Sequence, residues 1–411
     1  MKTLFINIKQ LLQVYEQNPS IISGLNMNTV PSIQNAYLLI EDDKIVQYGS
    51  MDSNLPNADK IIDVHGKTIF PSWCDSHTHI VFAATREEEF LMKIEGKSYE
   101  EIAAAGGGIL NSARKVEAAT EEELFISASN RLHQLIRLGT GSIEIKSGYG
   151  LSTNAELKML RVIKKLKAHF PIPIKATFLG AHAYPAIYKE NKEAYIQLII
   201  DEMLPRIHQE QLADYVDVFC EEGFFSTVDT ARILTAAATY GLAPKIHANQ
   251  LNVSGGVQVG VAHQAISVDH LECMDEAAIQ SLKGSNTIAT LLPSCSFYLG
   301  IPFAPARALM QENIPVALAS DYNPGSTPSG NMNFLFSLAC IKLKMKPMEA
   351  LNAMTINGAH AMQVADSVGS ITVGKKANFI ITKEIPSITY AAYSFGENCI
   401  ENVYINGSQI I

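Results

Sequence analysis

His77 and His79 flank a single threonine at the end of an apolar run from Thr68 to Trp73, and Asp75 lies two residues before the first histidine. Successive side chains of a strand face opposite sides, so histidines separated by one residue project from the same side. Two imidazoles on one face at a strand end form half of a metal site. The pattern therefore predicts metal chemistry if further ligands come from elsewhere in the chain.

The elements that must position these ligands are predicted by an alternation of strand-like and helical runs. Eight short apolar runs end in polar or reactive residues, at 68–79, 142–146, 174–182, 216–220, 244–247, 265–270, 287–293 and 316–321. Helical runs separate most of them, which is typical of parallel β/α architecture. The sequence thus predicts an α/β fold, a (β/α)8 TIM barrel, whose chemistry lies at the carboxyl ends of the strands.

Other strand ends supply the missing ligands. His247 and Asp321, together with the first two histidines, give three imidazoles and one carboxylate, which suit Zn²⁺ or Fe²⁺ and leave a position for water. A bound cation lowers the pKa of that water toward about 7 and makes it a hydrolytic nucleophile. The alternative is that these are strand-end histidines satisfied by backbone contacts.

Two more strand-end histidines could assist. His270 could orient the water or carry its proton, and the alternative is a core histidine bonded to a neighbour. His182 could donate to a substrate carbonyl or carboxylate, or develop positive charge beside one. Four histidines in helical or connecting stretches are assigned no role: His133, His169, His208 and His263.

The end of the fourth run bears on the number of metal ions. It reads Cys220-Glu221-Glu222, without a lysine to bridge two metals, and this favours one cation. Lys146, at the second run, is expected to be structural or near the substrate. Arg86 follows the first run, where a guanidinium would suit a substrate carboxylate. A helix-surface arginine paired with a glutamate is the alternative. The glycines at 106–108 could form a hinge.

The two ends of the chain have a different texture, with short alternating runs broken by tight turns. Neither end has enough apolar residues to close a core alone, so residues 1–69 and 368–411 are predicted to pack together as a small discontinuous β-sandwich domain. Residues 70–367 would form the barrel. Three capping boxes mark helix starts, at Ser98/Glu101, Thr120/Glu123 and Thr153/Glu156.

Composition limits the class of protein. The 411 residues carry a formal net charge of -9, with 41 acidic and 32 basic side chains spread along the chain, which argues against nucleic-acid or membrane partners. Six widely spaced cysteines indicate reduced, cytosolic usage. The N-terminus lacks a signal-peptide apolar core, and the chain has no run long enough to span a membrane. A cytoplasmic protein is expected.

These motifs resemble the metal-dependent amidohydrolase superfamily. Pro71-x-x-Cys-Asp-x-His-x-His79 is followed by His247, His270 and Asp321, and Gly374-Lys-Lys-Ala-Asn-Phe is similar to the superfamily's usual G-K-x-A-D-x. More narrowly, the chain resembles the imidazolonepropionase family over segments 77–83, 86–90, 99–109, 144–150, 177–182, 247–250 and 320–326. Departures from the superfamily pattern are few: Ser72 replaces a frequent glycine and Asn378 a frequent aspartate.

The resemblance implies hydrolysis of the cyclic amide of 4-imidazolone-5-propanoate to N-formimidoyl-L-glutamate, a step of histidine degradation, by a homodimer with one Zn or Fe per chain. It implies metal ligands at His77, His79, His247 and Asp321. It implies proton-handling or catalytic roles for His270, Asp321 and Gln250. The implied substrate contacts are Arg86, Tyr149, His182, Gln250, Asn323, Gly325 and Ser326.

Two other functions compete with this one. Deamination of a heterocycle favours a glutamate beside the fifth-strand histidine, and Gln250 argues against it because an amide is no general base. A non-catalytic barrel used as a scaffold is the other alternative, but such relatives usually lose metal ligands, and all four candidates are present here.

Overall fold

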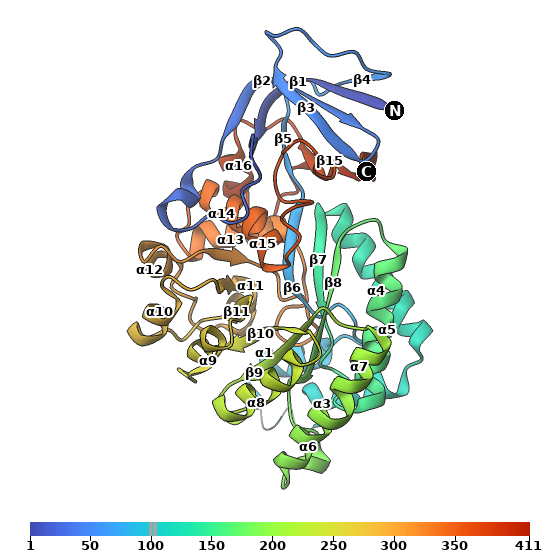
Figure 1. The fold of residues 1–411 in the computed structure, drawn as a ribbon, viewed down its shortest axis with the longest axis vertical. Helices are drawn as coiled ribbons and strands as arrows, with labels where there is room; N and C mark the ends of the chain where they lie inside the picture. Colours follow the sequence, from blue (N-terminus) through green and yellow to red (C-terminus); the bar gives the residue numbers. More distant parts are fainter. Residues whose placement is uncertain (98–100, 102–104) are drawn as a thin grey trace.

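The computed structural model describes residues 1–97, 101 and 105–411, and it consists of a barrel with a second sheet above it (Figure 1). Both chain termini lie in that upper sheet. Ser98 of the predicted capping box at Ser98/Glu101 and part of the segment 99–109 lie outside the described residues, so this capping box stays a prediction. Among the described residues, no helix is long and apolar enough to cross a lipid bilayer.

The barrel contains eight parallel strands that pair in chain order, as predicted. The last strand approaches the first, because the His79 N–H donates to the Tyr322 carbonyl at 2.8 Å. The strands are β6 (Trp73–Thr78), β7 (Thr140–Lys146), β8 (Ile174–Ala181), β9 (Tyr215–Cys220), β10 (Ala243–Ala248), β11 (Ser267–His270), β12 (Ile288–Leu291) and β13 (Val316–Leu318).

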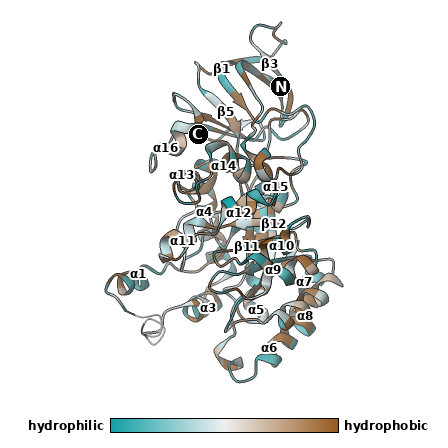
Figure 2. Ribbon diagram, turned by 90° about the vertical axis from the view of Figure 1, so that its left-hand side faces the viewer, coloured by the Kyte–Doolittle hydropathy of each residue, from teal (hydrophilic) through white to brown (hydrophobic). Residues whose placement is uncertain are grey.

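Helices surround the barrel and alternate with its strands (Figures 1 and 2). Short helix α1 lies apart from the other helices at one edge in Figure 2, and it buries none of its residues. The longer elements are α1 (Glu87–Ile94), α3 (Ile109–Ala118), α4 (Glu121–Arg137), α5 (Thr153–His169), α6 (Lys192–Leu198), α7 (Leu204–Glu210), α8 (Thr227–Ala238), α9 (Gly256–Ala262), α10 (Glu276–Leu282), α11 (Pro293–Leu299), α12 (Ala306–Gln311), α13 (Met332–Lys342), α14 (Pro347–Met354), α15 (Ile356–Ala361) and α16 (Ile388–Tyr393). Two short 3-10 helices are η1 (Gly24–Asn28) and η2 (Ala186–Tyr188), and η3 (Ile199–Met203) is a short π-helix.

The predicted helix starts are confirmed in one case and corrected in another. Thr120 and Glu123 form the reciprocal capping box of α4. At α5, however, Ser152 caps the helix by accepting from the Ala155 N–H. Glu156 turns away and accepts the N–H groups of Gly150 and Leu151, at 2.6 and 2.9 Å. The prediction of a capping box at Thr153 is therefore wrong, and Glu156 instead holds the loop that follows β7.

The second sheet joins the two ends of the chain, because β5 pairs with β14 in antiparallel register. Its strands are β1 (Lys2–Leu12), β2 (Ser32–Glu41), β3 (Lys44–Ser50), β4 (Lys60–Asp63), β5 (Thr68–Pro71), β14 (Phe379–Thr382), β15 (Ile400–Ile405) and β16 (Ser408–Gln409). The apolar run 68–79 is thus two strands in two sheets. The Ser72 N–H donates to the Asn378 carbonyl at this junction, at 3.1 Å. The domain boundaries themselves stay predictions.

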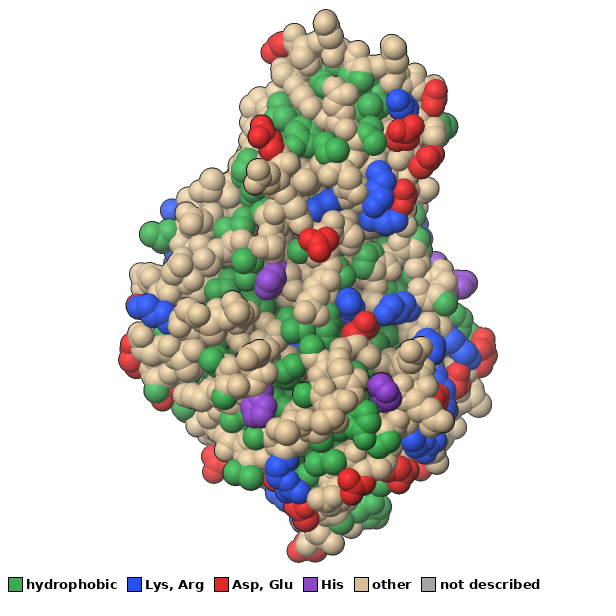
Figure 3. Space-filling view, in the orientation of Figure 1, with side chains coloured by type: hydrophobic (Ala, Val, Ile, Leu, Met, Phe, Trp, Pro, Cys, Tyr) green, Lys and Arg blue, Asp and Glu red, His purple; other side chains and the backbone are tan. Residues whose placement is uncertain are grey.

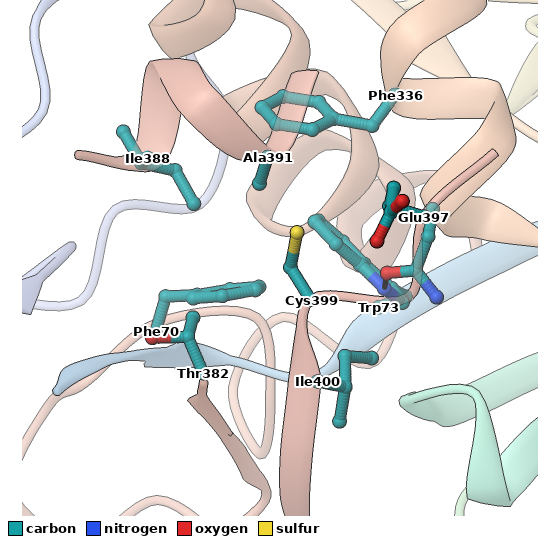
Figure 4. Close-up of a pocket in the computed structure, with 10 residues that line it drawn as sticks. Phe70, Trp73, Phe336, Thr382, Ile388, Ala391, Glu397, Cys399 and Ile400 are labelled. Atoms are coloured by element: carbon teal, nitrogen blue, oxygen red, sulfur yellow. Dashed lines mark hydrogen bonds between the residues drawn. The ribbon is translucent and has the colours of Figure 1, made fainter. Parts of the chain in front are cut away.

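The contact between the sheet and the barrel is closely packed. Phe70 and Trp73 lie side by side across the junction, with ring centroids 5.0 Å apart, and Cys399 points toward them (Figure 4). The cavity they line holds about 10 Å³, room for no more than about one water molecule. This junction is therefore a structural contact and not a substrate site.

On the face shown in Figure 3, basic and acidic side chains are interspersed.

Candidate metal centre and active site

The four predicted metal ligands meet at the carboxyl end of the barrel strands. Nε2 of His77 and Nε2 of His79 are 3.3 Å apart, and Asp321 Oδ1 lies 3.6 Å from each of them. His247 joins from the end of β10, with its ring centroid 4.5 Å from that of His77. One ligand atom from each of the three histidines lies within 4.8 Å of the others. All four side chains are buried.

Two aspartates, which the sequence patterns did not single out, orient these histidines. His77 Nδ1 lies 2.6 Å from Asp269 Oδ2, and His247 Nδ1 lies 3.0 Å from Asp217 Oδ1. Because a carboxylate accepts hydrogen bonds, each Nδ1 carries a hydrogen, which leaves Nε2 as the nitrogen available to a metal. Such outer partners fix the tautomer and orientation of a metal-binding histidine.

A buried network of charges lies beneath these aspartates. Lys146 Nζ is 2.6 Å from Glu144 Oε1 and 2.8 Å from Asp217 Oδ2, and Lys245 pairs with the other oxygen of Glu144. Burial alone would raise the pKa of Asp217, but His247 and Lys146 outweigh it and hold the pKa below its ordinary value. Lys146 therefore has the structural role that was one of its two expected roles.

Asp75 has a different task from the metal ligands. Its two carboxylate oxygens accept the Ser320 N–H at 2.9 Å and the Ser320 hydroxyl at 2.6 Å. The Asp321 N–H in turn donates to the His77 carbonyl at 2.9 Å. Asp321 adopts a φ of +54°, and His270 a φ of +84°. Strained residues of this kind persist where surrounding contacts fix them, and they cluster at functional sites.

The electrostatics of the centre suit a cation. Burial, together with neighbouring cationic groups, holds the pKa values of His77 and His79 well below their ordinary range, so both rings are neutral donors. Burial also raises the pKa of Asp321, because an ionised carboxylate is costly without a partner. Three imidazoles and one carboxylate form a donor set for a first-row divalent metal.

A cleft of about 460 Å³ lies beside this centre, a size that suits a small-molecule ligand. Its lining includes all seven residues that the resemblance assigned to substrate binding: Arg86, Tyr149, His182, Gln250, Asn323, Gly325 and Ser326. Their individual roles stay predictions.

Arg86 is held within the cleft. Its Nε donates to the Ser112 hydroxyl at 2.9 Å, and the guanidinium lies 5.7 Å from the Tyr149 ring centroid. Within the described part of the chain, its buried Nη2 has no hydrogen-bond partner. A Cβ atom at Gly325 would come within 2.5 Å of Arg86 Nη1. Glycine at this position thus makes room for the guanidinium.

His182 and Asn323 both make hydrogen bonds to the backbone of loops beside the cleft. His182 Nδ1 donates to the Gly148 carbonyl at 3.0 Å, and burial lowers its pKa to about 3. The ring is therefore neutral and its Nε2 is an acceptor, which corrects the expectation of a donor or of developing positive charge. The Asn323 amide accepts the N–H groups of Gly325 and Ser326, both at 2.8 Å, and so shapes their loop.

A second group of side chains surrounds His270. Its Nδ1 lies 3.5 Å from Glu272 Oε1, and Cys295 Sγ accepts from Gln250 Nε2 at 3.4 Å. Burial alone would lower the pKa of His270, but Glu272 and Cys295 outweigh it and raise the pKa well above its ordinary value. The sequence signal for Glu272 was its place two residues after a strand-end histidine, and Cys295 gave no comparable signal.

Comparison with known proteins agrees with this architecture. The sequence profile of the amidohydrolase family matches residues 68–410. Two solved structures share the fold: E. coli guanine deaminase, with a TM-score of 0.75, 16% identity and coverage of 100% of this chain and 99% of that chain, and 5-methylcytosine deaminase from Klebsiella pneumoniae, with a TM-score of 0.73, 15% identity and coverage of 98% and 97%.

Two curated relatives are similar over their whole length. The imidazolonepropionase of Christiangramia forsetii is 57% identical, with 100% of both chains covered. That of Alkaliphilus oremlandii is 41% identical, with 98% of this chain and 97% of the relative covered. The chain therefore belongs to the amidohydrolase family, and within it to the imidazolonepropionases.

Proposed function

We propose that the chain hydrolyses the cyclic amide of 4-imidazolone-5-propanoate to N-formimidoyl-L-glutamate, with one divalent cation held by His77, His79, His247 and Asp321. The observation that carries this proposal is the convergence of these four donors beside a cleft lined by all seven expected substrate residues. The full-length identity to relatives named imidazolonepropionase supports the choice of substrate.

The described residues fit the cation. Three imidazoles and one carboxylate are present, and aspartates fix two of the imidazoles through Nδ1. When bound, the cation lowers the pKa of a water molecule toward about 7 and polarises the ring carbonyl. Zinc and iron both accept such nitrogen and oxygen ligands, so we propose one or the other.

The reaction needs a group that moves a proton. The water oxygen bonds to the ring carbonyl carbon, the carbon–nitrogen bond of the ring breaks, and the released nitrogen takes up a proton while the carbon becomes a carboxylate. His270, whose raised pKa keeps it an imidazolium at neutral pH, gives a proton to the leaving nitrogen and takes up the proton of the water. Glu272, 3.5 Å from His270 Nδ1, stabilises this imidazolium. Asp321 is the alternative base.

The cleft residues orient the substrate. The free Nη2 of Arg86 binds the propionate carboxylate, since a guanidinium forms strong paired hydrogen bonds to carboxylates. The Gln250 amide bonds the ring without titrating, and the His182 Nε2 accepts from a ring N–H. Burial raises the pKa of Tyr149, so its phenol stays protonated and donates.

The test is turnover of freshly generated imidazolone propionate, with metal content measured on the same samples. About one zinc or iron per chain is expected, and His247→Ala should lose both metal and activity. His263→Ala, a histidine at the end of α9, is the matched control and should retain both. A metal-loaded protein that is inert on this substrate but deaminates guanine or cytosine would overturn the proposal.

The proposal also covers the oligomeric state and the cellular compartment: the chain forms a homodimer, and it works in the cytoplasm. All six cysteines are free thiols, which suits a reducing compartment. Sedimentation velocity measures the mass in solution, and a monomer at micromolar concentration would contradict the dimer. Cell fractionation tests the compartment.

A further inference from the structure

Three buried side chains of different chemistry meet at the edge of the active site. One ligand atom from each of His270, Glu272 and Cys295 lies within 4.8 Å of the ligand atoms of the other two. β11 ends at His270, Glu272 follows two residues later, and Cys295 lies in the first turn of α11. This group shares no residue with the four predicted ligands of the catalytic cation.

Two polar atoms of this group are unpaired. Among the described residues, neither His270 Nδ1 nor Glu272 Oε2 has a hydrogen-bond partner, although both side chains are buried. The 3.5 Å between His270 Nδ1 and Glu272 Oε1 is too long for a good hydrogen bond. Leaving such a buried atom without a hydrogen bond destabilises the protein, so a ligand that pairs with it would bind favourably here.

The chemistry of the three groups selects a metal ion. Imidazole, carboxylate and thiolate are the ligand types of zinc, and sulfur disfavours magnesium and calcium. Because the ligand form of cysteine is the thiolate and that of histidine is the neutral imidazole, binding breaks the Cys295 S–H bond and the His270 Nδ1–H bond. It forms a sulfur–metal and a nitrogen–metal bond and releases both protons to solvent. Neither an oxidant nor a reductant is required.

We propose that His270, Glu272 and Cys295 bind a second divalent cation of the zinc type, and that this second cation inhibits the enzyme. The inhibitory part rests on the proposed function, in which His270 moves a proton. An imidazole whose Nδ1 lone pair is bound to a cation carries a single hydrogen, on Nε2, and so it can no longer form the imidazolium that gives up a proton. One cation per chain therefore supports the reaction, and two arrest it.

Cobalt(II) gives a readout that is independent of activity. The four catalytic ligands include no sulfur, so a sulfur-to-cobalt charge-transfer band in the near ultraviolet reports the second site alone. The full chain is loaded with one equivalent of zinc and titrated with cobalt(II) for spectra, and separately with zinc for rates. We expect the second equivalent to produce the band and to lower turnover by about 100-fold, the contribution typical of general acid–base catalysis.

Variants separate the thiols. In Cys295→Ser the second equivalent of metal should produce no charge-transfer band and no inhibition. For every variant, the spectrum and rate at two equivalents are compared with those of the same variant at one equivalent. Cys273→Ser is the matched control, because Cys273 is a nearby and more exposed thiol outside the cluster, and it should behave as the wild type. If Cys295→Ser does not fold, Glu272→Gln serves instead and should weaken the second equivalent by at least about tenfold.

The proposal would be overturned if the wild type bound a single equivalent of metal and showed no charge-transfer band. The space between His270, Glu272 and Cys295 would then hold only water. A band that survives in Cys295→Ser and vanishes in Cys273→Ser would also overturn the proposal. If the one-equivalent protein fails to turn over imidazolone propionate, the proposed function falls. The stoichiometry and the cobalt spectrum would still decide the second site.

Discussion

The Nδ1 atom of His77 lies 2.6 Å from Oδ2 of Asp269, which joins the first and sixth strands of the barrel beneath the metal centre. Asp269 also accepts from the Ser267 hydroxyl at 2.6 Å, so the carboxylate is fixed from its own strand. The histidine ring is therefore oriented before any metal binds. A histidine held in this way loses little side-chain conformational entropy when it binds a cation.

Asp269→Asn should weaken metal binding by about 10–100-fold, because the neutral amide no longer supports the imidazole as a carboxylate does. Competition with a chelator measures this affinity directly. Asp275→Asn is the control: Asp275 caps α10 by accepting the Ala278 N–H at 2.8 Å and lies outside the site. Equal affinities for the two variants would contradict the role given to Asp269.

Arg86→Gln should raise KM for imidazolone propionate by about 10–150-fold and change kcat less, because a hydrogen bond to a charged group contributes about 1.5–3 kcal/mol to binding. Lys93→Gln is the matched control, since Lys93 lines the same cleft. Steady-state kinetics on both variants show which of the two side chains, Arg86 or Lys93, binds the substrate carboxylate. A larger rise in KM for Lys93→Gln would move the carboxylate contact to the lysine.

Gly358→Ala should destabilise the fold by about 1–3 kcal/mol through overpacking. A Cβ atom at Gly358, in α15, would lie 2.3 Å from the Cys74 carbonyl oxygen of β6. The backbone of a barrel strand cannot move aside as a flexible side chain does. Urea unfolding measures the change, and a difference within about 0.5 kcal/mol would show that the helix shifts freely.

Lys375 should make stability depend on alkaline pH. Burial lowers its pKa from 10.5 to about 8, while its ammonium donates to the Val368 carbonyl at 3.0 Å and to the Ser370 hydroxyl at 2.7 Å. Between these two pKa values the unfolded chain binds more protons than the folded chain at this position. Stability contributed by this group therefore rises with pH across that window and is flat below it.

The comparison with Lys375→Met isolates this effect, since all other titrating groups are common to both proteins. The unfolding free energy of the wild type minus that of the variant should increase by up to about 3 kcal/mol as the pH rises from about 8 to about 10.5. Urea unfolding at several pH values provides the measurement. A difference that stays constant or falls over this range would refute the assignment.

The sequence alone determined the barrel and predicted the four candidate metal ligands. His77, His79, His247 and Asp321 stand at or just after strand ends, and the two-residue period of a strand puts the first two on one face. Parallel strands in a barrel bring their carboxyl ends together whatever their separation in the chain. The meeting of these four side chains could therefore be predicted from local pattern and strand order, and their role as ligands stays a prediction.

Only the tertiary structure decided what supports those ligands. The pairing of Asp269 with His77 spans 192 residues and depends on the register between strands, which no local spacing encodes. The same holds for the meeting of Cys295 with His270 and for the division of residues 68–79 between two sheets. Glu156 illustrates the reason. Its local spacing favoured a helix cap, but its carboxylate instead accepts the buried N–H groups of the loop after β7. A buried N–H group without an acceptor costs free energy, and the sequence does not show which N–H groups are buried.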